Sequence, residues 1–338
     1  MRRCLALAEN GRGKVGINPM VGAVLVRDDA IIAEAFHEGF GLPHAEQSLL
    51  ERLHGEVRPG DVLCVNLEPC CHYGKTPPCT EAIIAAGVRH VVFGMEDPNL
   101  LVCGKGIAML RGAGIEVIGP VLPVECRRLN RGFVTLHEQG RPWVTLKQAQ
   151  TTDGRIARED GSPLKITSAA QDAWSHEMLR ARHDALLVGV ETIIRDKPQL
   201  DVRAKNKELV QPVPVILDPH GRLPPDSAVL REGTIIVTQQ HAGVHTEQCR
   251  SVGAANIENP AAPFQGAADF KQKGIRIFAV PMRGSVFHWP ALWHALTTPA
   301  DGYHGITSIL VEGGPRTWEA FRRAGCRDQE VVLVGMEA

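Results

Sequence analysis

Short apolar runs alternate with amphipathic stretches along roughly the first 120 residues of the chain. The apolar runs at 21–26 and 31–36 flank the turn-forming triplet Arg27-Asp28-Asp29, which predicts a β-hairpin. Because proline is favoured in the first turn of a helix, Pro43 favours a helix start directly after it. Further strands are predicted at 62–67, 88–94 and 115–118, and helices at 2–10, 44–53, 80–86 and 106–113. Strands separated by helices predict an α/β layer fold.

A boundary is predicted near residues 120–142, where a polar helical connector at 124–138 leads to the turn Gly140-Arg141-Pro142. A total length of 338 residues also agrees with two domains of typical size. The stretch 239–273 is rich in Ala, Gly, Pro and Gln and shows no periodic pattern. Strands of the second region are predicted at 144–148, 185–190, 213–217, 234–238, 275–280, 308–311 and 331–334.

Composition and charge exclude several classes of protein. Hydrophobic residues make up 44% and charged residues 22%, which excludes wholesale disorder. The formal net charge is −1 and there is no block of like charges, so the basic field of a nucleic-acid or anionic-membrane binder is missing. No secretory signal and no apolar run of bilayer length occurs. Five of the nine cysteines lie between residues 64 and 103, which favours a metal site in a reducing compartment. We expect a cytoplasmic, soluble enzyme.

The strongest chemical signal is a set of possible zinc ligands. His44, Cys70 and Cys79 offer one imidazole and two thiolates, which suit the tetrahedral preference of Zn²⁺. Three protein ligands leave a fourth position for water, and the metal lowers the pKa of that water. Glu46 lies two residues after His44, where it can reach such a water as a proton shuttle. A His-x-Glu pattern followed by Pro-Cys is typical of zinc-dependent deaminases.

Two alternatives to a catalytic zinc site stay open. In a closed structural site, Cys71 or His72 would supply a fourth ligand. The cysteines could also be buried without any metal. Neither alternative gives Glu46 a role. Cys64, Cys103, Cys126 and Cys249 are interpreted as small core residues.

The spacing of the paired cysteines bears on the substrate. Nucleic-acid and free-nucleoside deaminases place two residues between them, whereas eight stand between Cys70 and Cys79. This insertion holds an imidazole, an ammonium group and a hydroxyl, from His72, Lys75 and Thr76. Such groups suit a phosphate, for which lysine acts as a point charge. A solvated loop with an incidental lysine is the alternative.

Four segments together resemble a known family. They are Asn18-Pro19-Met20-Val21-Gly22, His44-Ala45-Glu46, the stretch from Glu68 through Cys79, and Asp97-Pro98-Asn99. They resemble the bifunctional riboflavin-biosynthesis deaminase/reductase family. Its members deaminate a diamino-ribosylamino-pyrimidinone 5′-phosphate and then reduce the ribosyl to a ribityl side chain with NADPH. The chain departs from the family at Cys71 and Leu100, where Ser and a second Pro are usual.

The resemblance implies roles for residues of the first half. His44, Cys70 and Cys79 would hold one zinc ion per chain, and Glu46 would be the catalytic proton donor. The ribose phosphate of the substrate would be held by Asn18, His72, Lys75 and Thr76. The implied fold is a cytidine-deaminase-like α/β/α layer domain at 1–120, a connector at 121–141 and a dihydrofolate-reductase-like α/β domain at 142–338, truncated at its C-terminus. The implied partner is a small pyrimidine ribose phosphate, bound by a homo-oligomer that binds neither nucleic acid nor membrane.

The second half gives weaker local signals. Glu312-Gly313-Gly314-Pro315 joins a predicted strand to the helix 316–323, and such a turn either binds a phosphate or is a plain tight turn. No Gly-x-Gly-x-x-Gly follows a strand, so a Rossmann site is not supported. The resemblance implies substrate contacts by Arg180, Leu200, Arg203 and Glu312, and NADPH contacts by Ala149, Thr192, Asp196, Gly314, Pro315, Arg316 and Thr317.

Some features of the second half depart from the family. Pro163-Leu164-Lys165 stands where the family has Ser-x-Trp, Lys197 replaces an aspartate, and Ala338 ends the chain before a further family strand. A deaminase whose second domain is only a structural partner is therefore the alternative function. A nucleic-acid deaminase is a third hypothesis, which the aromatic content of 5% and the balanced charge disfavour.

Overall fold

The computed structural model of the chain describes residues 1–53, 55–74, 77–100, 102–158, 164–203, 209–240 and 267–335. The chain forms two compact units. The first comprises Met1–Gly140 together with Pro299–His304, and the second comprises Arg141–Thr298 together with Gly305–Ala338. Residues 121–140, expected as part of a connector, fold as two helices of the first unit.

The first unit contains a mixed five-stranded sheet in the order β2-β1-β3-β4-β5. The hairpin β1–β2 and the pair β1–β3 are antiparallel, whereas β3–β4 and β4–β5 are parallel. The strands are β1 Gly22–Arg27, β2 Ala30–Phe36, β3 Val62–Val65, β4 His90–Phe93 and β5 Glu116–Ile118. The helices are α1 Arg2–Ala8, α2 Ala45–Arg52, α3 Cys79–Ala85, α4 Lys105–Gly112, α5 Pro123–Leu129 and α6 Arg131–Gln139, with a 3₁₀ turn at Glu9–Gly11.

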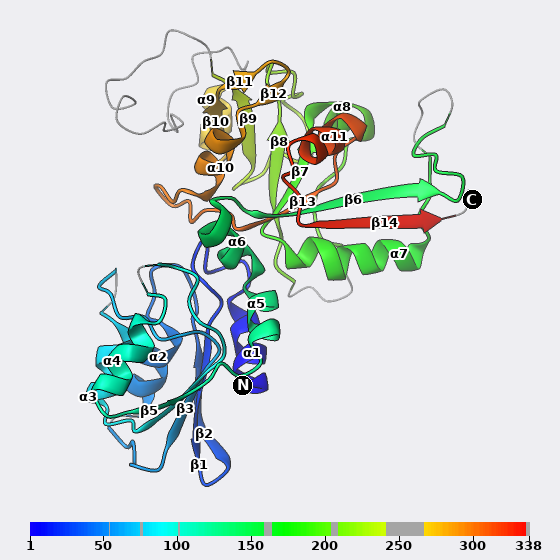
Figure 1. Cartoon of the computed structure of the whole chain (residues 1–338). Helices are drawn as coiled ribbons and strands as arrows, with labels where there is room; N and C mark the ends of the chain where they lie inside the picture. The colour runs from blue at the N-terminus through cyan, green and yellow to red at the C-terminus, as the bar shows by residue number, and fades with distance from the viewer. Residues whose placement is uncertain are drawn as a thin grey trace. The chain divides into compact units, whose positions relative to one another are not determined.

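Helices cover both faces of this sheet. Figure 1 shows α2, α3 and α4 on one side and α1 with α5 on the other. Side chains along β1 point alternately to the two faces of the sheet, and both faces are buried. Ala23 and Leu25 join the larger core, while Val24 packs with Cys4 and Leu7 of α1 on the other face. The predicted hairpin and the α/β/α layers are therefore confirmed.

The stretch read as a polar connector has a buried side. It breaks at Asn130 into α5 and α6, and Cys126, Phe133 and Val134 join the larger core of the first unit. Its many charged residues hid this apolar stripe, because only a minority of positions on a surface helix face the core. These two helices thus become part of the framework around the cavity described below.

The second unit is built on a seven-stranded sheet in the order β10-β9-β8-β7-β13-β6-β14, with every pairing parallel. The strands are β6 Trp143–Thr151, β7 Ala185–Gly189, β8 Val213–Leu217, β9 Ile235–Gln239, β10 Arg276–Val280, β13 Ser308–Val311 and β14 Gln329–Gly335, and a small hairpin joins β11 Met282–Arg283 to β12 Val286–Phe287. The helices are α7 Ala169–Trp174, α8 Val190–Asp196, α9 Ala267–Gln272, α10 Trp289–Thr297 and α11 Pro315–Arg323, with a π turn at Ser175–Leu179 and a 3₁₀ turn at Arg180–Arg182.

One carboxylate joins the two central strands of this sheet. Asp184, directly before β7, accepts hydrogen bonds at Oδ2 from the backbone N–H groups of Thr307 and Ser308 and from the Thr307 hydroxyl, at 2.8–2.9 Å. These contacts align the starts of β7 and β13. Asp184 is therefore a structural residue that sets the register of the two central strands.

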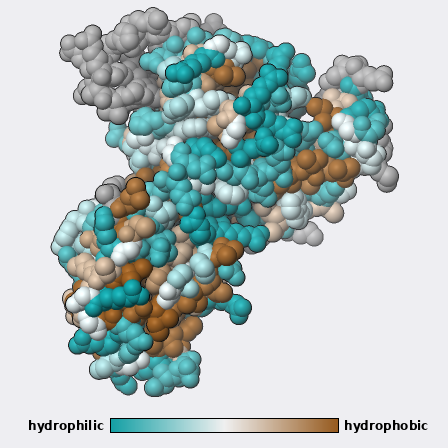
Figure 2. Space-filling model, in the orientation of Figure 1, coloured by the Kyte–Doolittle hydropathy of each residue, from teal (hydrophilic) through white to brown (hydrophobic). Residues whose placement is uncertain are grey.

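The outer face of the second unit includes exposed apolar residues on β14. Val332 and Val334 alternate along this strand and are 42% and 47% exposed. In the orientation of Figure 1, Figure 2 shows apolar surface in the region of β14, on an otherwise largely hydrophilic face of this unit. No helix among the described residues combines the length and the apolar character needed to cross a bilayer.

A nearly buried ion pair stabilises the β6–β14 edge. The two Arg141 Nη groups donate to the Asp328 carboxylate at 2.6 and 2.8 Å, and the Val144 N–H donates to it at 2.8 Å. We expect Asp328→Asn to lower the free energy of unfolding of the second unit by about 3 kcal/mol or more, because Arg141 would stay buried without a counter-charge. All five tryptophans lie beyond residue 141, so urea unfolding followed by tryptophan fluorescence reports on this unit.

The control for this prediction is Glu319→Gln, which breaks the exposed Glu319–Arg323 pair on α11. Exposed pairs are worth about 0–1 kcal/mol, so the control should leave the unfolding midpoint almost unchanged. Equal midpoints for the two variants would show that the Arg141–Asp328 pair does not stabilise the unit.

Candidate functional site

Two helix starts and one loop bring the predicted zinc ligands together. His44 directly precedes α2, Cys79 is the first residue of α3, and Cys70 lies in the loop that follows β3. Gln47 of α2 connects two of these segments, since its Oε1 accepts the His44 N–H at 3.4 Å and its Nε2 donates to the Pro77 carbonyl at 2.8 Å. Gln47 thus connects the segment of His44 to the segment that leads into α3.

The three ligand atoms have the spacing that a zinc ion requires. His44 Nδ1 lies 3.3 Å from Cys79 Sγ and 3.5 Å from Cys70 Sγ, and all three atoms lie within 4.8 Å of one another. Zn–N and Zn–S bonds of about 2.0 and 2.3 Å at tetrahedral angles place such atoms about 3.6 Å apart. No fourth His, Cys, Asp or Glu joins the group among the described residues, which leaves one position open. The expected fourth ligand of a closed site, Cys71 or His72, is not in it.

Among the three ligand groups, Cys70 is the one whose surroundings favour the deprotonated form. A hydrogen bond from Cys79, helped by one from His44, lowers the pKa of the Cys70 thiol to about 4, so Cys70 favours the thiolate. A hydrogen bond to Cys70 raises the pKa of His44. Glu46, 4% exposed, is not a member of the ligand group, and burial raises its pKa to about 6.

Glu68, two residues before Cys70, holds the loop that carries this ligand. Its buried carboxylate accepts backbone N–H groups from Asp97 at 3.2 Å, Gly104 at 2.9 Å and Ile107 at 3.2 Å. A Cβ on Gly106 would lie 2.0 Å from the Pro69 carbonyl oxygen, so only glycine fits there. One carboxylate therefore joins the Cys70 loop, the Asp97 loop and the start of α4.

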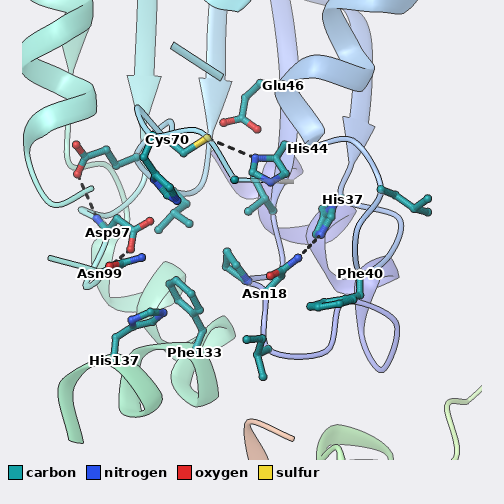
Figure 3. A pocket seen from close by; sticks show the side chains of 18 of the residues that line it. Asn18, His37, Phe40, His44, Glu46, Cys70, Asp97, Asn99, Phe133 and His137 are labelled. Atoms are coloured by element: carbon teal, nitrogen blue, oxygen red, sulfur yellow. Dashed lines mark hydrogen bonds between the residues drawn. The ribbon is translucent and has the colours of Figure 1, made fainter. Parts of the chain in front are cut away.

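A cavity of about 350 Å³ opens beside the ligand group. Figure 3 shows His44, Glu46 and Cys70 at one end, with Asp97 and Asn99 on one wall and Asn18, His37 and Phe40 on the opposite wall. Phe133 and His137 of α6 close another side, with their rings 4.5 Å apart. The volume suits a small organic molecule.

The orientation of the Asn18 amide follows from its neighbour. His37 Nδ1 lies 3.1 Å from the Pro43 carbonyl, which only accepts, so Nδ1 carries the proton. Burial lowers the pKa of His37, which keeps the ring neutral and leaves Nε2 as an acceptor. Asn18 Nδ2 therefore donates to Nε2 at 3.3 Å. The Asn18 carbonyl oxygen is thus left as an acceptor for a ligand.

Asp97 is a buried acid on the cavity wall, 6% exposed. Burial raises its pKa to about 7, and the negative charge of Glu68 adds to this effect. Its Oδ1 accepts the Asn99 N–H at 2.8 Å, and its other oxygen has no hydrogen-bond partner among the described residues. Such an oxygen can accept a hydrogen bond from a ligand.

The predicted phosphate-binding residues lie in the insertion between Cys70 and Cys79. His72 lines the cavity and is exposed, whereas Lys75 and Thr76 lie outside the described residues. Sequence reasoning missed other lining residues, among them His37, Asp97, Asn99, Phe133 and His137. Asp97 and Asn99 stood in a quoted motif without a role, while the others carry no local spacing signal.

In the second unit, Arg180 and Glu312 form a pair at the carboxyl edge of the sheet. Arg180 Nε and Nη2 donate to the Glu312 carboxylate at 3.1 and 2.5 Å, and Nη1 donates to the Asp201 carbonyl at 2.8 Å. Burial opposes ionisation of Glu312, but Arg180, Lys147 and His176 outweigh it and lower the pKa of Glu312. Lys147 was missed by the sequence reasoning.

Other predicted residues of this unit lie around the same edge. Leu200 is buried and its carbonyl accepts from Arg231 Nη2 at 2.8 Å. Arg203 is exposed, although its backbone N–H donates to His176 Nδ1 at 2.9 Å. Lys165, which stands at the position of a family tryptophan, pairs with Asp172 of α7.

A glycine-rich turn precedes α11, with Gly314 in extended conformation before the first helical residue. A Cβ added to Gly189, at the end of β7, would lie 3.0 Å from Thr317 Oγ1, so Thr317 is close to β7. A Cβ added to Gly314 would lie 3.9 Å from Thr192 Oγ1, so Thr192 is close to the turn. Ala149 lies on β6 beyond Leu146, the partner of the last residue of β13. The carboxyl edge of the sheet therefore carries the glycine-rich turn together with Thr192, Thr317 and Ala149. Three further residues of the predicted cofactor site are exposed, namely Pro315, Arg316 and Asp196, the last residue of α8.

Comparisons with known proteins agree with both halves. Residues 1–95 match the cytidine and deoxycytidylate deaminase zinc-binding region, and residues 142–335 match the RibD C-terminal domain. The riboflavin biosynthesis protein RibD of Aquifex aeolicus is 39% identical over 334 residues, which cover 99% of this chain and 85% of that protein. The corresponding protein of Escherichia coli is 38% identical over 348 residues, with 99% and 86% covered.

Solved structures give the same result. Acinetobacter baumannii RibD is 31% identical with a TM-score of 0.79, and the match covers 100% of this chain and 86% of that chain. A diaminohydroxyphosphoribosylaminopyrimidine deaminase/5-amino-6-(5-phosphoribosylamino)uracil reductase from Thermotoga maritima is 35% identical with a TM-score of 0.76, covering 100% and 88%.

A zinc-type deaminase unit followed by a reductase unit on one chain defines a bifunctional enzyme. Its first half carries the His-Cys-Cys site, and its reductase half implies a nicotinamide cofactor. The chain belongs to the RibD family of riboflavin-biosynthesis deaminase/reductases.

Zinc content tests the ligand set directly. We expect Cys79→Ala to lose the metal, because only two of the three ligands remain. Cys103→Ala removes an exposed cysteine outside the group and should keep one zinc ion per chain. Elemental analysis of the purified proteins measures both. Full zinc in Cys79→Ala would remove Cys79 from the ligand set.

Proposed function

We propose that the chain catalyses two successive steps on one pyrimidine ribose phosphate. The first is hydrolytic deamination of 2,5-diamino-6-ribosylamino-4(3H)-pyrimidinone 5′-phosphate, and the second is reduction of the ribosyl to the ribityl side chain by NADPH. The observation that carries the proposal is the cavity in which the ligand group and Glu46 face Asn18, Asp97 and Asn99. The Thermotoga maritima relative, which is named as a deaminase and reductase, supports the same pair of steps.

In the deamination, Glu46 is the residue that moves protons. Zinc, when bound, supplies Lewis-acid activation of water near neutral pH. The water oxygen bonds to the ring carbon that carries the amino group, the C–N bond breaks and ammonia leaves. Glu46 accepts a proton from the attacking water and donates one to the departing nitrogen. Its burial beside His44, with a pKa raised to about 6, suits both transfers.

The walls of the cavity hold the substrate. The free oxygen of Asp97 is placed to accept N–H groups of the diaminopyrimidinone ring, and Asn99 lies beside it. Phe133 and His137 provide aromatic surface for the ring. Asn18 and His72, with Lys75 and Thr76, hold the ribose phosphate group. Lysine and hydroxyl donors distinguish a phosphorylated substrate from a free base.

In the reduction, the glycine-rich turn before α11 holds the phosphates of NADPH through backbone N–H groups at the helix start. Ala149, Thr192, Asp196 and the residues from Gly314 to Thr317 contact the cofactor. Arg180, Leu200, Arg203 and Glu312 contact the substrate, and the pairing of Arg180 with Glu312 pre-orients the guanidinium group. We also expect a homo-oligomer.

The direct test is incubation of the purified chain with the diaminopyrimidinone ribosylamino phosphate, with and without NADPH, followed by mass analysis of the products. Exchange of an amino group for oxygen without NADPH, and uptake of two hydrogens only with it, are the expected results. Deamination without reduction would support the alternative in which the second unit is a structural partner. No product in either reaction would contradict the proposal.

Glu46→Gln tests the proton-transfer role. The amide cannot accept and return a proton, so we expect deamination to fall by about 10²–10⁴-fold while zinc content stays full. Glu51→Gln, at the exposed far end of α2, is the matched control and should deaminate normally. Undiminished turnover in Glu46→Gln would assign the proton transfer to another group.

Thr317→Val tests the cofactor site. The substitution keeps the shape of the side chain but removes the hydroxyl beside the turn. Loss of one hydrogen bond to a charged group, worth about 1.5–3 kcal/mol, predicts NADPH binding about 10- to 150-fold weaker in calorimetric titration. Deamination should be unchanged. Thr297→Val, which removes a hydroxyl from α10, is the control. Equal NADPH affinity in both variants would exclude Thr317 as a contact.

A further inference from the structure

Two buried amides hold the backbone of the loop that carries Asn18. Asn130 Oδ1 accepts the Met20 N–H at 2.8 Å, and Asn130 Nδ2 donates to the Met20 carbonyl at 3.0 Å. Asn66 Nδ2 donates to the same carbonyl at 3.0 Å, and Asn66 Oδ1 accepts the Gly22 N–H at 2.7 Å. Asn130 is 2% exposed and Asn66 is fully buried. Each amide uses both its donor and its acceptor on this one loop.

Asn130 lies far from the catalytic motifs in the sequence. It occupies the break between α5 and α6, 110 residues after Met20, and outside the matched zinc-binding region that ends at residue 95. Its own backbone is fixed on both sides, since its N–H donates to the Cys126 carbonyl at 3.1 Å and its carbonyl accepts the Val134 N–H at 2.9 Å. The same helix, α6, carries the cavity residues Phe133 and His137.

We propose that Asn130 is a positioning residue for the deamination, acting through Met20 to place the Asn18 carboxamide in the cavity. The inference rests on the proposed role of Asn18 in holding the substrate. Asn18 is held at its side chain by His37, at 3.3 Å, and through the backbone at Met20. Pro19 between them has a fixed φ, which removes one of the rotations that would absorb a displacement of Met20. On its other side, the Asn18 N–H donates to the Val15 carbonyl at 3.1 Å, so Met20 is the anchor on the C-terminal side of Asn18.

Loss of the Asn130 side chain should weaken substrate binding and leave proton transfer unchanged. Without the Asn130 side chain, the Met20 N–H loses its buried acceptor, while Asn66 still holds the Met20 carbonyl. The loop therefore shifts and does not unfold. Displacements of about 1 Å at a positioning group reduce catalytic efficiency by up to about 100-fold. Glu46 and the zinc ligands lie on other segments and keep their geometry.

The test is a double-mutant cycle with Asn130→Ala and Asn18→Ala, assayed by deamination of the diaminopyrimidinone ribosylamino phosphate. Asn130→Ala should raise KM about tenfold, with kcat changed less than about threefold and zinc content full. In the Asn18→Ala background, Asn130→Ala should change KM less than about twofold. The effects of the two substitutions on KM are not additive when one residue acts through the other. Thr135→Ala is the control, since it truncates another buried side chain of α6.

The outcomes distinguish a wrong role for Asn18 from a wrong role for Asn130. If Asn18→Ala alone leaves KM unchanged, the proposed role of Asn18 in substrate binding is wrong. If Asn18→Ala raises KM but the effect of Asn130→Ala is fully additive with it, or if Thr135→Ala raises KM equally, Asn130 supports only the fold and the inference is overturned. A loss of zinc in Asn130→Ala would overturn it as well.

Discussion

The buried carboxylate of Glu68 is the interaction on which the deaminase site depends. A buried charge is tolerated only when it is fully hydrogen-bonded, and here three backbone N–H groups from separate segments meet that need. The loop with Cys70, the loop with Asp97 and the start of α4 are therefore fixed against one another. A metal ligand and a wall of the cavity therefore share one support.

The parts of the fold that the sequence predicted are those with strong local signals. The hairpin β1–β2 follows from two apolar runs around Arg27-Asp28-Asp29, and most central strands were found because parallel strands are continuous apolar runs. The helices α8 and α10 had no such signal, whereas α7 was missed although Ser168 and Gln171 form a capping box at its start. α10, with the sequence WPALWHALT, is apolar over almost its whole length and shows no amphipathic period.

The site residues that were predictable are likewise those with a strong local signal. The zinc ligands and Glu46 were predictable because fixed spacing and residue type state their chemistry directly. His37 and His137 were not, since a lone histidine in a sequence is most often a packed core residue. Asn130 had even less signal, because its partner Met20 lies 110 residues away and the contact is to backbone atoms, which leave no trace in residue type. The Arg180–Glu312 contact needed the fold to bring distant residues together.

The fixed hydrogen-bond pattern of His37 has a consequence for how the substrate is read. The His37 Nδ1–H donates to the Pro43 carbonyl and its Nε2 accepts from the Asn18 amide nitrogen, which leaves the Asn18 carbonyl oxygen as an acceptor for a ligand. An acceptor of this kind matches a sugar hydroxyl and repels a phosphate oxygen. Under the proposed function, we therefore expect Asn18 to contact the ribose and the cationic residues of the cysteine-flanked insertion to select for the phosphate.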